Sequence, residues 1–417
     1  MLITVSNLFP RPDQPTRGMF NFQLFCEVNN QLAVGPRQQA VGGHGGQYLN
    51  ICLVPEWRLW RWSTIRRWKM TGNPTTVYLP VFYLPVLGRS INWWFYYRAL
   101  RQGVNGAAES ILASWLYPDA VAVARVAQDI GAPVWLRVHG TDRYHLKNRH
   151  RRRLILEAVA YAQGVICNCQ AVADDLVKWG ISMDKIHIIP NGIDAGLFHY
   201  RSKEDALKRL GKEGAIAPNV SVAYSPSVLF IGNLVPIKGP DVLLRAFAAL
   251  KRKQLSSDSP LGSPSTTTEQ PKNSTTVLLI IGSGPMRAHL ERLTRELGIA
   301  DQVHFLGNRS HDEVALWMNV ADVLCLTSRS EGMPNVVMEA LVSGIPVVAT
   351  SVGACPELLS HELTARLCKP DDSMDVAIRL HEVLEHDVDR ESLACRHHHL
   401  NSWAHRAEDM LALVCKR

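Results

Sequence analysis

The sequence contains no apolar run long enough to cross a membrane. No stretch of about 18 residues is free of polar side chains, and the apolar stretch 77–87 contains two prolines. The first residues, MLITVSNLFP, lack the basic start and long apolar stretch of a secretory signal peptide. We therefore expect a cytoplasmic protein without a membrane-spanning helix.

Patterns typical of disulfides and metal sites are also missing. The nine cysteines are an odd number, and the closest pair, Cys167 and Cys169, has one residue between its members, whereas zinc and redox motifs have two. We expect reduced thiols in the core. No DxD sequence lies in a loop suited to a metal, and the histidines at 397–399 lie in a polar stretch before the last expected helix. We expect no metal and no other cofactor.

The composition is that of a folded protein. Hydrophobic residues make up 47% of the 417 residues and charged residues 20%, which excludes wholesale disorder. A chain of this length suits two domains of about 200 residues each. The net charge of +7 is uneven: residues 1–200 contain 21 lysines and arginines against 12 acidic residues, whereas residues 201–417 contain 24 against 26. The positive charge therefore belongs to the first half.

Short β-branched runs alternate with amphipathic stretches along the whole chain. A spacing of roughly 20 to 30 residues between such runs is typical of helices packed on a parallel sheet. The fold class is therefore α/β, with two Rossmann-like domains. We expect strands near 2–5, 111–114, 134–138, 164–167 and 186–189 in the first half, and near 228–231, 277–281, 303–305, 323–326 and 346–349 in the second.

Two irregular stretches indicate the domain organisation. The stretch 198–227 is polar and then rich in Gly, Pro and Ser, which predicts a linker with a boundary near residue 200. The stretch 253–276 consists almost wholly of Ser, Thr, Pro, Gln and Lys, which predicts a disordered surface insertion. The expected parts are a first domain at 1–200, a second domain at 201–395, and a C-terminal helix at 396–417 that packs back toward the first domain.

The segment SRSEGMPNVVMEALVSGIPVV, residues 328–348, carries the clearest chemical signal. Pro334 favours a helix start and Gly344 favours the helix end. The helix N-terminus then lies at the carboxyl end of the sheet, where free N–H groups favour a phosphate. Glu331 and Glu339 would lie about 12 Å apart along a helix, which is similar to the length of a sugar nucleotide. The alternative is a capped helix with an ordinary solvated glutamate.

The part EGMPNVVMEAL resembles the EX7E signature of the retaining family 4 glycosyltransferases, whose fold is GT-B. Four further segments resemble motifs of that family in the same order. They are VHGTD at 138–142, IPNGID at 189–194, FIGNLVPIKGPDVLL at 230–244 and IGSGP at 281–285. Each short motif is weak alone, but together they cover the chain except 35–105 and the insertion. The resemblance implies two Rossmann-like domains whose parallel sheets face each other across a cleft. It also implies that 1–200 is the acceptor-side domain and that 201–395 is the nucleotide-sugar-binding domain.

The resemblance also implies roles for the motif residues. Glu339 would hold the donor ribose, Glu331 and His139 would lie at the transferred sugar, and Lys238 would neutralise the diphosphate. A fixed ammonium stabilises the departing nucleoside diphosphate most in the transition state. Simpler interpretations are a core histidine at His139, a solvated Lys238 and a plain turn at Gly18. The implied donor-binding residues also include Gly18, Asn233, Gly284, Arg309, Gly332, Met333, Pro334 and Asn335.

One position departs from the family pattern. Asn233 stands where the family usually has an arginine on the diphosphate, and asparagine brings no charge. A charge-assisted hydrogen bond contributes roughly 1.5 to 3 kcal/mol, so its loss weakens donor binding or turnover by about tenfold or more. Either another cation supplies the missing charge, with Arg309 and Arg329 as candidates, or the activity is low.

A cluster of tryptophans and basic residues lies in the first half. The segment WRLWRWSTIRRWK, residues 57–69, interleaves four tryptophans with five basic residues, and an aromatic group follows at 93–97. Indoles favour the lipid headgroup layer, and basic side chains are drawn to anionic lipid. We therefore expect a peripheral contact with an anionic membrane, which a second basic run at 147–153 would widen. The alternatives are a plain surface loop and a nucleic-acid stacking patch.

The sequence thus predicts a metal-independent retaining glycosyltransferase. It would move a hexose-type sugar from a nucleotide diphosphate sugar to a glycan or lipid-linked acceptor in polysaccharide or glycolipid synthesis, without a nucleic-acid partner. The resemblance implies that the departing phosphate takes the acceptor proton, so that no covalent intermediate is needed. Three alternatives are a sugar-nucleotide epimerase, a phosphorylase-like enzyme and a catalytically weak scaffold protein.

Overall fold

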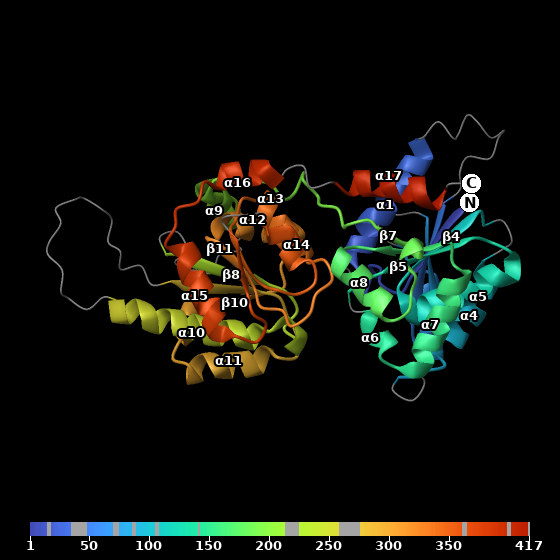
Figure 1. The fold of residues 1–417 in the computed structure, drawn as a ribbon, viewed down its shortest axis with the longest axis horizontal. Coiled ribbons are helices and arrows are strands. Elements are labelled where there is room, and N and C mark those ends of the chain that lie inside the picture. The colour runs from blue at the N-terminus through green and yellow to red at the C-terminus, as the bar shows by residue number, and fades with distance from the viewer. Residues whose placement is uncertain are drawn as a thin grey trace. The chain divides into compact units, whose positions relative to one another are not determined.

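The chain forms two compact units (Figure 1). The first unit comprises Met1–Gly192 with Asn401–Arg417, and the second comprises Ile193–Leu400. The division falls before the expected position near residue 200, because Ile193 and Phe198 are buried in the core of the second unit. The computed structural model describes residues 1–14, 18–34, 48–69, 75–85, 89–104, 108–140, 142–212, 225–257, 276–360, 365–397 and 402–415.

The first unit contains a parallel sheet of seven strands in the order β3-β2-β1-β4-β5-β6-β7. The five strands predicted in this half are confirmed, and two further strands, β2 and β3, extend the sheet on the far side of β1. The strands are β1 (Leu2–Ser6), β2 (Tyr48–Pro55), β3 (Thr76–Val81), β4 (Ser110–Ser114), β5 (Val134–Val138), β6 (Gly164–Cys167) and β7 (Ile186–Ile188).

The two additional strands contain residues that obscure a strand pattern. Asn50 lies within β2, where its side chain accepts a hydrogen bond from Thr4 (2.9 Å) and donates one to Thr76 (3.1 Å). Pro80 lies within β3, which is an edge strand and therefore tolerates a residue without an N–H group. Cross-strand partners and edge position thus make these residues compatible with the sheet.

Helices cover the sheet of the first unit, and the last of them comes from the C-terminus. Helix α17 packs against α1, and Gln31 donates a hydrogen bond to the carbonyl of Ala404 (2.6 Å). The helices are α1 (Met19–Val34), α3 (Trp62–Arg66), α4 (Asn92–Gly103), α5 (Val121–Ile130), α6 (Arg143–Leu146), α7 (Arg149–Tyr161), α8 (Gln170–Lys178) and α17 (Trp403–Val414), with short turns η1 (Leu59–Arg61) and η3 (Leu116–Ala120).

The second unit contains a parallel sheet of six strands in the order β10-β9-β8-β11-β12-β13. The five predicted strands are confirmed, and the short β13, with a polar arginine in its three residues, was not predicted. The strands are β8 (Ser227–Ile231), β9 (Val277–Ile281), β10 (Val303–Gly307), β11 (Val323–Leu326), β12 (Val347–Thr350) and β13 (Arg366–Cys368).

The helices of the second unit correct two expected boundaries. Helix α10 continues through Ser257, so the expected insertion at 253–276 begins as helix, and residues 258–275 lie outside the described residues. The expected C-terminal helix at 396–417 begins later than expected, because α16 ends at His397 in this unit and α17 begins at Trp403. The helices are α9 (Lys203–Lys212), α10 (Pro240–Ser257), α11 (Arg287–Glu296), α12 (His311–Val320), α13 (Asn335–Val342), α14 (Cys355–Leu359), α15 (Ser373–Leu384) and α16 (Arg390–His397).

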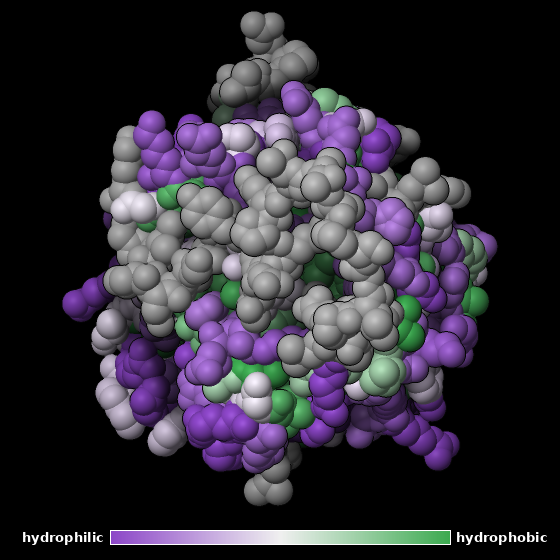
Figure 2. Space-filling view, turned by 90° about the vertical axis from the view of Figure 1, so that its left-hand side faces the viewer, coloured by the Kyte–Doolittle hydropathy of each residue, from purple (hydrophilic) through white to green (hydrophobic). Residues whose placement is uncertain are grey.

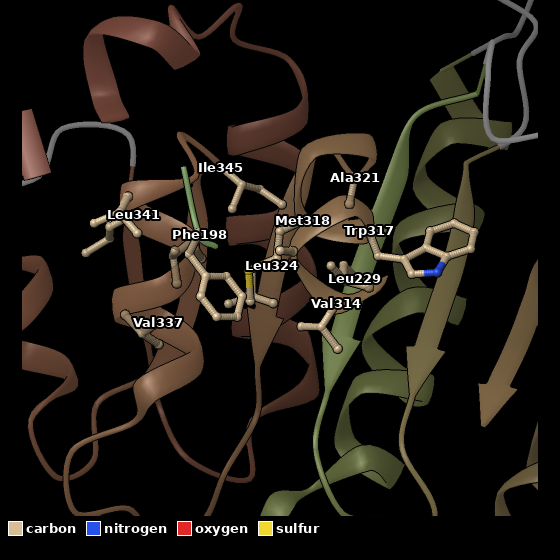
Figure 3. Close-up of a cluster of buried hydrophobic side chains, with 14 of the residues drawn as sticks. Phe198, Leu229, Val314, Trp317, Met318, Ala321, Leu324, Val337, Leu341 and Ile345 are labelled. Carbon is tan, nitrogen blue, oxygen red and sulfur yellow. The ribbon is translucent and has the colours of Figure 1, made fainter. Parts of the chain in front are cut away.

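Both faces of the second sheet are buried. Figure 3 shows one of the two hydrophobic clusters of this unit, which includes Trp317 and Met318 of α12, Leu341 of α13 and Leu324 of β11. The other cluster holds alternate residues of the same strands, together with apolar side chains of α10, α11 and α15. Burial on both faces explains the continuous apolar strands and requires helices on each side. The coloured part of the face drawn in Figure 2 is mainly hydrophilic, with small hydrophobic areas.

Two general features concern membranes and metals. Within the described ranges, no helix has the length and apolar character needed to cross a membrane. Those same ranges contain no group of three or more histidine, cysteine or acidic side chains arranged to hold a metal ion. All nine cysteines are free thiols.

Candidate functional site

Glu331 lies in the loop between β11 and α13 and contacts a lysine. Its Oε1 accepts hydrogen bonds from Lys238 Nζ (2.6 Å) and from Ser328 Oγ (2.6 Å). The Glu331 side chain is 10% exposed and the Lys238 side chain 29%, so the pair lies at the edge of the unit's interior. The structure therefore brings together two of the predicted site residues, separated by 93 positions in the sequence.

The backbone explains why Lys238 and Glu331 meet. Lys238 ends a short turn, η5 (Pro236–Lys238), after which Gly239 adopts a left-handed conformation with φ of 61°. A side chain at Gly239 would collide with the Thr327 carbonyl, so this approach requires glycine. Thr327 Oγ1 donates to the Gly239 carbonyl (2.8 Å), and the Arg329 amide donates to the Ile237 carbonyl (2.8 Å). These bonds hold the two loops side by side.

Helix α13 begins directly after this loop, as predicted. Its N-cap is Pro334, which makes no side-chain cap, and the preceding Gly332 carbonyl accepts from the Ala354 amide (2.8 Å). Met333 packs against the core, and Asn335 begins the helix. The N-terminus of a helix favours an anion, because its dipole is positive there.

Glu339 lies one turn further along α13. Its side chain is half-buried, and the loss of water around the carboxyl raises its pKa to about 7. Desolvation disfavours the charged form of a carboxyl, so Glu339 is readily protonated near neutral pH. A ligand that offers hydroxyl donors would stabilise the ionised form. This behaviour suits the ribose contact that the family resemblance implies.

Two turns follow the carboxyl ends of β8 and β9, and the backbones of these turns are hydrogen-bonded to each other. The Gly232 amide donates to the Ile281 carbonyl (3.0 Å), and the Leu234 amide donates to the Ser283 carbonyl (2.9 Å). Asn233 is exposed between these bonded positions, and Gly284 follows Ser283 in the second turn. The structure thus joins the predicted turns of Asn233 and Gly284 through their backbones.

The two arginines expected to compensate for Asn233 are both paired with acids. Arg329 contacts Asp241 (2.9 Å) and Asp371 (2.6 Å), and its hydrogen bond to Asp241 raises the pKa of the guanidinium. Arg309 contacts Glu313 (3.0 Å), which also caps α12 through the amide of Ser310 (2.9 Å). Either arginine would have to share or leave its carboxylate in order to bind a phosphate.

The first unit contains the second part of the predicted site, around His139. This residue follows β5 and is 7% exposed. Its Nε2 lies 2.9 Å from Ser114 Oγ, and its ring packs with Phe20 at 4.6 Å between centroids. Burial, and then the charge of Arg137, lower the pKa of His139 well below its usual value, so the imidazole is neutral.

Hydrogen bonds define the tautomer of His139. Ser114 Oγ donates to Asn21 Oδ1 (2.9 Å), so the hydroxyl oxygen can accept the proton of His139 Nε2. Asn21 Oδ1 also accepts from Arg137 Nη1 (2.8 Å), and Arg137 Nη2 donates to Asn191 Oδ1 (3.0 Å). In this network His139 carries its proton on Nε2 and presents Nδ1 as an acceptor.

Asp142 orients the His139 loop. Its Oδ2 accepts from the His139 amide (2.8 Å), and its Oδ1 accepts from the Leu116 amide (3.0 Å). Burial raises the pKa of Asp142 to about 7, although these two hydrogen bonds favour the carboxylate. One buried carboxylate therefore connects the loop after β5 with the loop after β4.

Gly18 is required by the structure of the first unit. It adopts a left-handed conformation with φ of 62°, and a side chain there would collide with the Leu8 carbonyl. Its contact with a donor phosphate stays a prediction.

Sequence reasoning missed the buried polar network of Asn21, Ser114 and Arg137. The available signal was Arg137 within the apolar strand VWLRV, because a charged residue in a buried strand is rarely accidental.

The tryptophan-rich segment lies on the surface of the first unit. Trp57 is 59% exposed and Trp60 is 72% exposed. Arg58 and Arg61 both bind Glu56, at 2.9 Å and 2.8 Å, and the hydrogen bond from Arg58 is the main cause that lowers the pKa of Glu56 to about 2. Part of the basic charge is therefore already neutralised.

The aromatic residues at 93–97 differ in their exposure to solvent. Trp94 is exposed, whereas Tyr96 is buried in the unit and Tyr97 donates to Asp129 (2.6 Å). The basic run at 147–153 is divided between different partners, because Arg153 pairs with Glu157 (3.0 Å), whereas Arg151 binds His145 (2.9 Å).

Two protein families match the chain. Residues 54–197 match Glycosyltransferase Family 4, and residues 216–397 match Glycosyl transferases group 1. The chain is 30% identical over 280 residues to D-inositol 3-phosphate glycosyltransferase of Jonesia denitrificans, a match covering 63% of this chain and 59% of that protein. It is 32% identical over 274 residues to the protein of the same name from Actinosynnema mirum, covering 63% and 60%. The match spans about three-fifths of the length of these relatives.

Solved structures with the same fold cover nearly the whole chain. Anabaena HepE in complex with UDP-glucose matches with a TM-score of 0.69 and 17% identity, covering 100% of this chain and 99% of that chain. Sucrose-phosphate synthase from Thermosynechococcus elongatus matches with a TM-score of 0.71 and 18% identity, covering 99% and 98%. The two parallel sheets and these likenesses confirm the predicted pair of Rossmann-like domains and the GT-B fold class.

Proposed function

Because the chain belongs to the family 4 glycosyltransferases of GT-B fold, we propose that it moves a hexose-type sugar from a nucleotide diphosphate sugar to a glycan or lipid-linked acceptor. The reaction would retain the anomeric configuration, need no metal ion and take place in the cytoplasm. The observation that carries the proposal is the Lys238–Glu331 pair beside the N-terminus of α13. The UDP-glucose complex of Anabaena HepE supports a nucleotide sugar as donor, and the names of the relatives make D-inositol 3-phosphate an acceptor to test.

The charges of the second unit support this chemistry. When the bond between sugar and diphosphate breaks, the nucleoside diphosphate gains negative charge. The ammonium of Lys238, which Glu331 holds, and the N-terminus of α13 are positive groups placed by the two bonded loops, and groups placed in advance stabilise developing charge. Glu331, held by Lys238 and Ser328, offers a carboxylate to sugar hydroxyls. Glu339 offers another to the ribose.

His139 of the first unit would take part as a hydrogen-bond acceptor. It is neutral and presents Nδ1, because Nε2 keeps its proton and donates it in a hydrogen bond to Ser114 Oγ. A sugar hydroxyl could donate to this nitrogen. We propose that His139 positions the transferred sugar and does not act as a charged acid.

We also propose that the first unit contacts an anionic membrane through Trp57, Leu59 and Trp60. These three apolar side chains are exposed, and Arg66 and Arg67 lie exposed next to them. A cavity of about 280 Å³ lies nearby and is lined in part by Trp62, Arg66, Phe82 and Trp94. Exposed indoles beside basic side chains suit the headgroup layer of anionic lipid.

Donor binding tests the proposal first. UDP, GDP, ADP and dTDP, each with a common hexose, are screened by thermal shift, and the best nucleotide sugar is then titrated by calorimetry. We expect binding by one class of base. Lys238→Met should weaken it by about tenfold or more, since a charge-assisted contact is lost. Lys208→Met, an exposed lysine on α9, is the matched control and should bind as the wild type does.

The products separate the rival functions. A transferase releases nucleoside diphosphate when an acceptor is added. An epimerase releases an epimer of the donor without acceptor, and a phosphorylase-like enzyme needs phosphate to cleave a glycan. Donor binding without any turnover would leave only the scaffold role.

A further inference from the structure

The first unit contains a cavity of about 510 Å³ that none of the predicted donor contacts uses. Arg11 follows β1, Arg89 precedes α4, and Arg151 lies in the first turn of α7, and all three line it. His145 and Tyr117 lie on its wall as well. The volume is that of a typical small-molecule site.

The cavity is strongly basic. Among the described residues that line it, three are arginines and none is acidic. Arg11 pairs with Asp13 outside the cavity (3.2 Å), but no ion pair within the described structure joins Arg89 or Arg151 to an acid. The Nε atom of Arg151 is buried and has no hydrogen-bond partner there. The charges of Arg89 and Arg151 are thus available to an anion.

The lowered pKa of His145 indicates the same positive potential. Its Nδ1 accepts a hydrogen bond from Arg151 Nη1 (2.9 Å), so the proton of the neutral ring is on Nε2. Burial, and then the charges of Arg151 and Arg89, lower the pKa of His145 to about 4. The ring therefore stays neutral at physiological pH.

The cavity lies next to His139. Trp115 lines the cavity, and its ring stacks on the His139 ring at 6.0 Å between centroids, with an angle of 28° between the planes. The carboxylate of Asp142 bonds both loops, through the amides of His139 and Leu116. A molecule in the cavity would therefore lie beside the residue proposed to position the transferred sugar.

We propose that this cavity binds the acceptor through a phosphate ester, held by Arg89 and Arg151, with Arg11 as a third cation on the cavity wall. The inference rests on the proposed transferase function and specifies its acceptor. Guanidinium groups bind phosphate oxygens with two parallel hydrogen bonds, and three of them around one small cavity favour an anion over a neutral sugar. The phosphate belongs either to a soluble sugar phosphate or to a lipid-linked one.

Binding assays on the full chain test the cavity independently of transfer. The soluble probes are D-inositol 3-phosphate and glucose 6-phosphate, compared with inositol and glucose, and the lipid probes are vesicles of phosphatidylinositol compared with phosphatidylcholine. We expect a phosphorylated probe to bind at least about tenfold more tightly than its neutral parent. Equal binding of phosphorylated and neutral probes in both arms overturns the proposal.

Variants then locate the site. Arg151→Gln and Arg89→Gln should each weaken binding of the phosphorylated probe by about tenfold and raise the KM for that acceptor, while donor affinity stays unchanged. Arg151→Lys, which keeps the charge, should weaken binding of the phosphorylated probe less than Arg151→Gln does. The matched control is Arg153→Gln on the same helix, because Arg153 is exposed and pairs with Glu157. An equal loss in Arg153→Gln, or no loss in the cavity variants, contradicts the assignment.

The donor titration keeps the two proposals apart. If a nucleotide sugar binds and no phosphorylated probe does, the cavity proposal fails and the transferase proposal stands. If no nucleotide sugar binds but the phosphorylated probe binds with the expected variant losses, the cavity binds an anion and the transferase proposal fails. Circular dichroism of each variant shows that the fold is intact.

Discussion

Lys238 Nζ lies 2.6 Å from Glu331 Oε1, so the proposed phosphate-binding cation and the proposed sugar-binding carboxylate neutralise each other when no donor is bound. A bound diphosphate would compete with Glu331 for the ammonium. Glu331→Gln should therefore tighten the binding of the nucleoside diphosphate alone by about threefold to tenfold, while it lowers kcat with the sugar donor. Calorimetry and initial rates measure the two effects. Weaker nucleoside diphosphate binding in Glu331→Gln would mean that Lys238 does not contact the phosphates.

Asn233 is the second informative position, because it is exposed in the turn joined to Gly284. An arginine there should tighten donor binding or raise kcat/KM by about tenfold, or roughly 1.4 kcal/mol. Arg309 and Arg329 already pair with Glu313 and Asp241, so we expect the gain to be similar in the wild type and in Arg309→Ala.

A gain confined to the Arg309→Ala or Arg329→Ala background would show that the native arginine supplies the charge. If neither Asn233→Arg nor Lys238→Met alters donor binding in any background, the phosphate site lies elsewhere.

Glu339 predicts a pH dependence of stability. Burial raises its pKa from 4.5 to about 7, so between these values the folded chain holds a proton that the unfolded chain has released. Its contribution to the free energy of unfolding is complete below pH 4.5 and is lost as the pH rises through about 7. Urea denaturation from about pH 5 to about pH 8 should show a steeper decline in wild type than in Glu339→Gln.

Glu296→Gln is the control for Glu339, because Glu296 is exposed at the end of α11. It should follow the wild-type pH dependence. Parallel curves for wild type and Glu339→Gln would show that the carboxyl titrates normally in the folded chain.

The exposed side chains of the segment 57–69 predict which of them contribute most to membrane binding. Arg58 and Arg61 share the carboxylate of Glu56, which offsets one of their two charges, so replacing both with Ser should weaken binding to anionic vesicles less than Arg66→Ser with Arg67→Ser. Trp57→Ser with Trp60→Ser should weaken it as well. Vesicle sedimentation measures each loss.

The control pair for the membrane contact is Arg292→Ser with Arg295→Ser, exposed on α11 of the second unit. It should bind vesicles as the wild type does. Equal binding of wild type to neutral and anionic vesicles would contradict the proposed contact with an anionic membrane.

Local sequence patterns predicted much of the fold and the loop between β11 and α13. Continuous apolar strands between helices are local features, and so is the spacing of Glu331 and Glu339 around Pro334. The strands β2 and β3 were missed because Asn50 and Pro80 interrupt the apolar pattern, and only cross-strand partners and edge position make them compatible with a sheet.

Contacts between distant segments could not be predicted. Arg11, Arg89 and Arg151 meet at one cavity although they lie far apart in the chain, and nothing in their neighbouring residues indicates a shared site. The pairing of Arg329 with Asp241 likewise depends on two loops that only the folded sheet brings together.

The most direct test of the proposed transfer is the anomeric configuration of the product, followed by proton NMR. The chain is incubated in EDTA with the nucleotide sugar that binds best and with D-inositol 3-phosphate or a lipid-linked acceptor. We predict release of nucleoside diphosphate together with a glycoside that keeps the donor's configuration, abolished in Glu331→Ala and unchanged in Glu296→Ala. An inverted product, a reaction that needs added metal, or full transfer by Glu331→Ala would contradict the account.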